Sequence, residues 1–442
     1  MHRFLLALAL LAAAASCRAL TAEEAGVLSR RVVAGEPAAR AALLESVARR
    51  DAEAEFALAQ LVFDGRGFAA DAGQARRLAE RAAARGHAGA QNMLGYFWQN
   101  ALGGAGDLIE ARRWYEEAAN TGDAKAQVNL GWLYQEGLGV DQDAARAAQL
   151  YERAAVGGSA AAMFNLGALN ETRLRNARAA ADWYEKAAAT GVVAADYRLG
   201  KMIEEGSGRR KDAAQALSHY LKAAPAGIGD AQLAAARLLD SDAAGPRRPA
   251  EALRWFEAAA ATPNAEASYR SALLRLMPDA GKPDQAAAQA HFRAAAALGH
   301  AESQYRLALI LRRSGAAAES AEWLRKAAEQ KHPAAMLRYA QVLEKGDGLR
   351  ADAAQALQWY QRSGDLGDAE ALFSLGRLYE AGSGAPADAR RAMQYFVKAA
   401  EKGHPAAKEM MQGVFGPPPD PSSRDRPFGA PAPFGGSSPF PR

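Results

Sequence analysis

The sequence predicts an all-α fold: a right-handed α-solenoid of about ten helix-turn-helix repeats, each 32–36 residues long. The first observation is composition, because alanine and other strong helix formers abound while the strand-favouring Val, Ile and Thr are scarce. The second is a leucine that recurs every 36 residues, at Leu58, Leu94, Leu130 and Leu166. A short fixed period of this kind is the signature of stacked supersecondary units.

Residues 1–16 have the features of an export signal. Arg3 gives a basic start, and the 12-residue apolar run from Phe4 to Ala15 suits a signal peptide but is too short to span a bilayer. Cys17, the single cysteine of the chain, directly follows this segment, and the four residues that end at it resemble a bacterial lipobox. Two outcomes stay open: lipidation of Cys17, or ordinary cleavage at a small residue nearby. Neither leaves a disulfide, because there is no second cysteine.

Residues 17–51 are expected to form a linker and a capping helix in front of the array, and the third repeat then shows the repeating unit. Its first helix is expected from Ala126 to Glu136, with apolar residues on one stripe. Gly137-Leu138-Gly139 breaks this helix, a second helix runs from about Ala144 to Ala155, and Gly158 ends the unit.

The residue that follows this glycine is expected to N-cap the first helix of the next repeat. Several of these residues, such as Asp123 and Ser159, are good caps. Counted in this phase, the array covers residues 52–404, with repeats at 52–87, 88–123, 124–159, 160–192, 193–228, 229–264, 265–300, 301–332, 333–368 and 369–404. Residues 405–416 begin an eleventh unit that is expected to close the rear. The Pro/Gly/Ser-rich residues 417–442 are expected to be a disordered tail.

These residues resemble the Sel-1-like repeat family, which is related to the tetratricopeptide repeats. The resemblance rests on phrases such as Asn129-Leu130-Gly131-Trp132-Leu133-Tyr134 and Trp114-Tyr115-Glu116-Glu117-Ala118-Ala119, and it covers residues 52–404. Repeats six and seven are the least regular, since prolines replace the Gly-x-Gly turn there. The resemblance implies a binding scaffold with a concave surface lined by the first helix of each repeat.

The sequence offers no catalytic centre. His87, His300, His332 and His404 fall in the N-cap phase, and the two other histidines of the mature chain fall where five repeats carry tryptophan, so none has the spacing of a metal-ligand pair. The glycine turns lack the ending of a phosphate loop. We therefore expect no enzymatic activity, no metal and no cofactor. The formal charge of +4 comes from interspersed charges, which argues against nucleic-acid binding.

Candidate ligand contacts lie on the first helices, where the residue just before the conserved leucine points away from the core stripe. The candidates of this row, with those of the neighbouring groove phase, are Asn129, Asn165, Arg198, Lys201, Arg237, Arg270, Arg306, Arg338 and Arg377. A guanidinium group suits recognition of carboxylates. The alternative is a solvated face, because Arg270 and Arg306 follow glutamates by four residues. Arg198 and Arg338 follow alanine at that spacing and are expected to be freer.

The sequence thus predicts a non-enzymatic scaffold of the bacterial cell envelope that binds an extended partner with acidic groups in its groove. The expected location is the periplasm or the outer membrane, with membrane contact only through a lipid on Cys17. The alternative function is a lipoprotein scaffold that binds or helps to export an acidic exopolysaccharide. Only Tyr96 and Trp132 offer aromatic rings in the groove phase, which favours a protein or peptide partner over a sugar.

Overall fold

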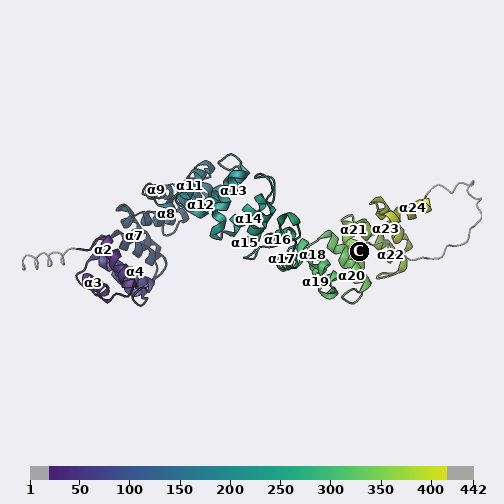
Figure 1. Cartoon of the computed structure of the whole chain (residues 1–442), viewed down its shortest axis with the longest axis horizontal. Coiled ribbons are helices and arrows are strands. Elements are labelled where there is room, and N and C mark those ends of the chain that lie inside the picture. Colours follow the sequence, from purple (N-terminus) through teal and green to yellow (C-terminus); the bar gives the residue numbers. More distant parts are fainter. Residues whose placement is uncertain (1–18, 416–442) are drawn as a thin grey trace, which may run out of the picture. The chain divides into compact units, whose positions relative to one another are not determined.

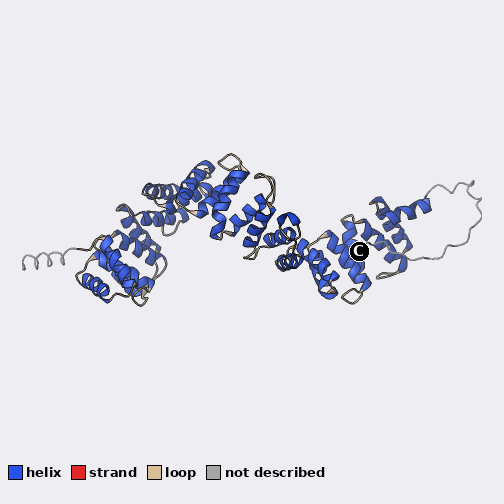
Figure 2. Cartoon of the chain, viewed as in Figure 1, coloured by secondary structure: helices blue, strands red, loops and turns tan. Residues whose placement is uncertain are grey.

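The computed structural model describes residues 19–415, so the predicted signal segment 1–16, Cys17 and the tail 417–442 lie outside the described residues. Within them the chain forms 23 α-helices, two short 3₁₀ helices and no strand (Figures 1 and 2). The all-α, helix-turn-helix architecture predicted from the sequence is confirmed. None of the described helices is long and apolar enough to cross a membrane.

The chain divides into two compact units, one ending at Ala259 and the other beginning at Ala260. The first unit holds two front helices and six repeats. Its helices are α2 (Ala22–Val33), α3 (Pro37–Ala48), α4 (Ala52–Asp64), α5 (Ala72–Ala83), α6 (Ala88–Gln99), α7 (Leu108–Asn120), α8 (Ala124–Glu136), α9 (Ala144–Val156), α10 (Ala160–Thr172), α11 (Ala177–Ala189), α12 (Val193–Glu205), α13 (Ala213–Ala223), η1 (Ala224–Ala226), α14 (Gly229–Leu239) and α15 (Pro249–Ala259).

The second unit holds four repeats and a closing helix. Its helices are α16 (Ala265–Leu274), η2 (Pro278–Ala280), α17 (Gln285–Ala297), α18 (Ala301–Arg313), α19 (Ala317–Glu329), α20 (Pro333–Lys345), α21 (Ala353–Asp365), α22 (Ala369–Ala381), α23 (Ala389–Glu401) and α24 (Pro405–Phe415). Helix α24 packs against α23 and buries Ala407 completely.

The segment in front of the first repeat differs from the prediction. One capping helix was expected there, but α2 and α3 are separate helices, and both pack against α4. The break has a local cause: Gly35 takes a positive φ of 83°, and Pro37 stands at the start of α3. Proline lacks the N–H that a helix interior needs but is well suited to the first helical position.

The first helices begin at the N-cap residues predicted from the sequence, and the Gly-x-Gly turns end them as predicted. The side chains of Asp123, Ser159, Asn264 and Asp368 each accept the backbone N–H that lies three residues further on. Both glycines of the Gly-x-Gly turns have positive φ, for instance 73° at Gly137 and 66° at Gly139. L-residues with a side chain avoid this backbone conformation, so the turn requires glycine.

The core of each regular repeat is built around one close approach between its two helices. An aromatic ring from the second helix lies on the small residue that follows the conserved leucine of the first helix. At Gly131 a Cβ atom would lie 2.7 Å from Cε1 of Tyr151, and at Gly167 it would lie 2.6 Å from the ring of Tyr184. Both rings are fully buried. The recurring glycine therefore makes room for a ring.

Candidate functional site

The nine candidate residues all lie on first helices, in two sets. The first unit carries Asn129 on α8, Asn165 on α10, Arg198 and Lys201 on α12, and Arg237 on α14. The second unit carries Arg270 on α16, Arg306 on α18, Arg338 on α20 and Arg377 on α22. We call the surface that these positions form within each unit the first-helix face. Successive first helices meet along it through their side chains, as the contacts below show.

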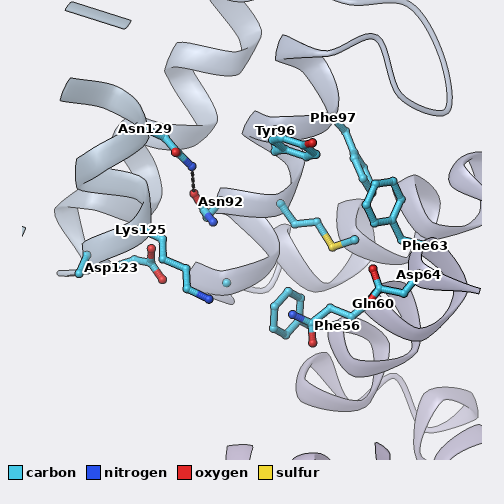
Figure 3. Close-up of a pocket in the computed structure, with 13 residues that line it drawn as sticks. Phe56, Gln60, Phe63, Asp64, Asn92, Tyr96, Phe97, Asp123, Lys125 and Asn129 are labelled. Carbon is cyan, nitrogen blue, oxygen red and sulfur yellow. Dashed lines mark hydrogen bonds between the residues drawn. The ribbon is translucent and has the colours of Figure 1, made fainter. Parts of the chain in front are cut away.

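At the front of the first unit, this face contains a cavity of about 580 Å³ formed by α4, α6 and α8 (Figure 3). Most of its wall is apolar: Phe56, Phe63, Met93, Tyr96 and Phe97 line it. Its polar residues are Gln60, Asp64, Asn92, Asp123, Lys125 and Asn129. The Nδ2 group of Asn129 donates to Oδ1 of Asn92 at 2.9 Å, which joins the second and third repeats. We call this hollow the front cavity.

A second cavity, of about 420 Å³, lies between α12 and α14 and includes Lys201 and Arg237 in its lining. Carboxylates share it, namely Glu204, Glu205 and Asp230. The Nζ atom of Lys201 lies 3.9 Å from Oε1 of Glu205. The cations predicted from the sequence are thus brought together here, but in a surface of mixed charge.

Arg198 has a carboxylate neighbour that the sequence analysis did not anticipate. Its Nη1 lies 3.6 Å from Oε1 of Glu171, which belongs to the first helix of the preceding repeat. Arg198 was expected to be freer because no glutamate precedes it by four residues, but the preceding repeat supplies a carboxylate instead. Burial raises the pKa of the Tyr151 hydroxyl, and Asn165, the candidate between Asn129 and Arg198, acts on that pKa in the opposite direction.

The arginines of the second unit differ in how strongly they are held. Nε of Arg306 pairs with Glu302, as the four-residue spacing predicted, and Nη2 of Arg377 lies 3.0 Å from Oε1 of Glu344. Nη1 of Arg338 donates to the amide oxygen of Gln341 at 3.1 Å, and no carboxylate among residues 19–415 pairs with this arginine. Arg270 is exposed and has no ion-pair or hydrogen-bond partner among the described residues. Among the four candidate arginines of this unit, Arg270 and Arg338 are therefore the most available to a ligand.

A tyrosine network, which was not predicted from the sequence, connects this face to the core. The hydroxyl of Tyr184 donates to Oε2 of Glu171 at 2.7 Å, and the hydroxyl of Tyr360 donates to Oε2 of Glu344 at 2.6 Å. Each of these carboxylates uses its other oxygen for an arginine of the face. Burial first, and the carboxylate second, raise the pKa of both tyrosines well above the ordinary value. The tyrosines therefore stay neutral and donate.

The signal for this network is present in the sequence, but it spans two helices. The tyrosine recurs in the second helix of five repeats, and a Gln or Glu lies 13 or 16 residues before it. In the other three pairs, the hydroxyl groups of Tyr115, Tyr151 and Tyr220 donate to Gln99, Gln135 and Glu204. Periodicity within one helix cannot reveal such a pair.

The histidines have the structural role that their phase predicted. At His87, His332 and His404, Nδ1 accepts a backbone N–H of the helix that follows, at 3.1–3.2 Å. Nε2 of each lies 2.8–3.1 Å from a glutamate near the start of the same repeat, respectively Glu53, Glu302 and Glu370. Among residues 19–415 no group of His, Cys, Asp and Glu is arranged to hold a metal ion.

Comparison with known proteins places these features in a family. The Sel1 repeat family model matches ten times and covers most of the chain. The matches span residues 52–87, 88–123, 124–159, 160–192, 193–227, 230–261, 265–300, 301–332, 333–368 and 369–404. No curated protein matches the chain.

Two solved structures illustrate the similarity. The crystal structure of c5321, described as a protective antigen present in uropathogenic Escherichia coli strains displaying an SLR fold, is 27% identical over 89% of this chain and 87% of its own, with a TM-score of 0.67. A Sel1 repeat protein from Oxalobacter formigenes is 22% identical over 88% of this chain and 94% of its own, with a TM-score of 0.41.

Proposed function

The chain belongs to the Sel1 repeat family, and we propose that it is an interaction scaffold of the bacterial cell envelope that binds an extended partner along its first-helix faces. Family membership supports the scaffold role, and the sequence of residues 1–17 supports the location. Sel1 repeat proteins are generally non-catalytic scaffolds that mediate protein–protein interactions. The partner that we propose is a protein segment with acidic groups.

The observation that carries this proposal is the repeated presentation of amides and guanidinium groups on successive first helices. Asn92 and Asn129 stand at the front of the first unit. Arg270 and Arg338 stand in the second, where no carboxylate of the described part of the chain pairs with them. Amides suit an extended peptide backbone, and guanidinium groups suit its carboxylates. Where a glutamate already pairs with a cation of the face, the pair is exposed and worth only about 0–1 kcal/mol, so a ligand can replace it.

Capture of the partner tests the proposal. We would use the mature chain to isolate binding proteins from an envelope extract and measure their affinity for wild type and for the double variant Arg270→Ala with Arg338→Ala. Loss of two charge-assisted contacts should weaken binding about tenfold and reduce its dependence on salt. The control is Arg390→Ala, an exposed arginine on the second helix α23 of the same unit. Equal affinity of the double variant and wild type would refute the first-helix face as the binding surface.

The envelope location rests on the sequence of residues 1–17 and needs its own test. We propose that the chain is exported and anchored through Cys17. Mass spectrometry of the mature N-terminus should find an acylated Cys17. A free N-terminus downstream of Cys17 would contradict the anchor, and a chain that retains residues 1–16 in the cytoplasm would contradict export.

An acidic exopolysaccharide is the second candidate partner, and one observation favours it. Tyr96 and Trp132 are 44% and 37% exposed on the first-helix face, where aromatic rings could stack on sugars. Binding of a purified uronic-acid polymer, abolished by Trp132→Ala and untouched by Arg390→Ala, would support this alternative. Capture of proteins alone would exclude it.

A further inference from the structure

We propose that the front cavity anchors one bulky aromatic side chain of an extended peptide, and that a carboxylate on the same peptide meets Lys125. The inference rests on the proposed scaffold function and adds a specificity to it: the partner is recognised at the front by an aromatic residue and not by charge alone. Three observations support this inference: the aromatic lining of the cavity, the absence of a side chain at Gly89, and the exposed Lys125 at the edge of the cavity.

The wall of the cavity suits an aromatic guest. Phe56 and Phe63 come from α4 and Tyr96 from α6, so the rings enclose the space from two repeats (Figure 3). The rings of Phe63 and Tyr96 meet edge to face at a centroid distance of 6.4 Å, yet Tyr96 is still 44% exposed. Aromatic pairs favour this geometry and stabilise a contact beyond its buried area. A guest ring would cover the apolar surface that Tyr96 now exposes.

Gly89 keeps this space open. It holds the second position of its first helix, where the other nine repeats carry a side chain, namely Glu53, Lys125, Ala161, Ala194, Asp230, Glu266, Glu302, Ala334 and Glu370. A Cβ atom at Gly89 would lie 2.9 Å from Cζ of Phe56. Because a larger side chain would occupy the space beside that ring, the sequence of the second repeat is the one that leaves a hollow there.

The polar side of the cavity can engage a peptide backbone. The structure gives Asn92 and Asn129 one hydrogen bond to each other, from Nδ2 of Asn129 to Oδ1 of Asn92. An amide side chain has two N–H donors and a carbonyl acceptor, so the pair retains donors on Asn92 and an acceptor on Asn129. A peptide unit offers both complementary groups, whereas a purely apolar guest would leave these groups unused.

Lys125 supplies the charge complementarity. It is exposed at the edge of the cavity and makes no ion pair with any residue of the described part of the chain. Of the two carboxylates in the lining, Asp123 caps α8 by accepting the N–H of Ala126 at 2.7 Å with Oδ1, and Oδ2 of Asp64 lies 4.0 Å from Nη1 of Arg66. Lys125 is therefore the cation that can receive a carboxylate close to the anchored ring.

The test begins with selection from a random 12-residue peptide library displayed on phage, with the full chain as target. Peptides enriched on wild type should contain Phe, Tyr or Trp within a few residues of Asp or Glu. An enriched peptide is then synthesised with a fluorophore, and its Kd is measured by anisotropy. We expect Gly89→Leu to fill the cavity and Tyr96→Ala to remove its wall, each weakening binding at least tenfold. Lys125→Ala should weaken it about threefold and reduce its dependence on salt.

The control is Ala161→Leu, which adds the same side chain at the same repeat position outside the cavity and should leave Kd unchanged. If Gly89→Leu fails to fold, as judged by circular dichroism, the exposed Tyr96 still provides the test. The inference is overturned if selection gives no aromatic consensus, or if the peptides bind Tyr96→Ala as tightly as wild type. Capture of a natural partner whose affinity is the same for wild type, Gly89→Leu, Tyr96→Ala and Lys125→Ala would refute the aromatic anchor and leave the proposed scaffold function intact.

Discussion

At the scale of single residues, the first-helix face and the core share their side chains. Glu171 accepts the hydroxyl of the buried Tyr184 with one oxygen and faces Arg198 with the other. Glu344 does the same for Tyr360 and Arg377. The surface cations are thereby oriented by groups whose positions the core fixes. Substitution of the core tyrosine should therefore change both the free energy of unfolding and the orientation of the surface arginine.

Tyr184→Phe should lower the free energy of unfolding by about 1 kcal/mol, because the hydrogen bond to Glu171 is lost while the ring packing remains. Gly167→Ala should cost more, about 1–3 kcal/mol, since its Cβ would lie 2.6 Å from the ring of Tyr184. Urea unfolding followed by circular dichroism measures both. Tyr96→Phe, at an exposed tyrosine, is the control and should stay within about 0.5 kcal/mol of wild type. An alanine at 167 that costs nothing would show that the ring does not need the glycine.

The histidine caps predict a dependence of stability on pH at His300. Burial lowers the pKa of its imidazole, as does His332, although Glu302 and Glu266 act in the opposite direction. Its Nδ1 also accepts the N–H of Ser303 at 3.2 Å, which requires the unprotonated nitrogen. Between the folded pKa and the unfolded value of about 6.5, the unfolded chain binds more protons, so stability rises with pH. The contribution is complete above about pH 6.5 and is lost progressively as the pH falls below that value.

His300→Asn should flatten this dependence. Asparagine is a good N-cap and does not titrate, so the helix start is retained while the proton linkage is removed. Melting temperatures of wild type and variant between pH 5 and 7.5 give the comparison. The melting temperature of wild type should fall more steeply toward pH 5 than that of the variant. Parallel curves would show that His300 does not couple stability to protonation.

At the scale of elements, the Gly-x-Gly turns set how a repeat meets the one before it. The second glycine lies against the start of the preceding second helix: a Cβ at Gly348 would lie 2.3 Å from the carbonyl group of Ala317. A positive φ alone would favour glycine there. The contact is a second reason, because any side chain at this position would collide with the backbone of the preceding repeat. The turn therefore acts in two ways, in its own backbone conformation and in the spacing of neighbouring repeats.

Gly348→Ala and Gly315→Ala separate these two effects. Both glycines have a φ of 83°, but a Cβ at Gly315 meets nothing within 4 Å. Gly315→Ala should therefore lower the free energy of unfolding only by the strain of a left-handed alanine, about 1–2 kcal/mol. Gly348→Ala should cost at least about 1–3 kcal/mol more, because backbone must move to admit the methyl group. The difference in urea midpoint between the two variants measures the contact, and equal midpoints would refute it.

At the scale of the whole molecule, the division into two units falls where the repeats are least regular. The first unit ends with α15 and the second begins before α16, a helix of 10 residues followed by the 3₁₀ turn η2. Most first helices of the array have 13 residues, so the sixth and seventh repeats offer their neighbours less helix to pack on. In repeat proteins stability is a sum of repeat terms and nearest-neighbour terms, and weak interfaces divide the cooperative unit.

We expect urea to unfold the chain in two steps. Gly348→Ala, in the second unit, should shift one transition and leave the other in place. Tryptophan fluorescence can separate the steps, since Trp98, Trp114, Trp132, Trp183 and Trp255 belong to the first unit, and Trp323 and Trp359 belong to the second. Limited proteolysis should first cut near residues 260–264. One transition with coincident fluorescence and circular dichroism would show a single cooperative array.

The sequence by itself determined the features that depend on neighbours along the chain. Leucine periodicity located the first helices, Asp123 and Ser159 showed their starts, and Gly137 and Gly139 showed their turns. The reason is physical: caps, positive φ and an apolar stripe act over fewer than ten residues, and a repeat array multiplies each signal ten times. The candidates of the first-helix face could be found in the same way, because the apolar stripe of a helix shows which of its positions point away from the core.

The tertiary structure decided which of those candidates are paired and where the face is hollow. Arg198 meets Glu171 from 27 residues earlier, and the front cavity depends on Gly89 lying against Phe56 from 33 residues earlier. Such pairs are set by the rotation between successive repeats, which results from the packing of many side chains at each junction. No local sequence pattern encodes that rotation. Arg198 and Arg338 therefore occupy the same position of the repeat, yet Arg198 has a carboxylate partner and Arg338 has none among the described residues.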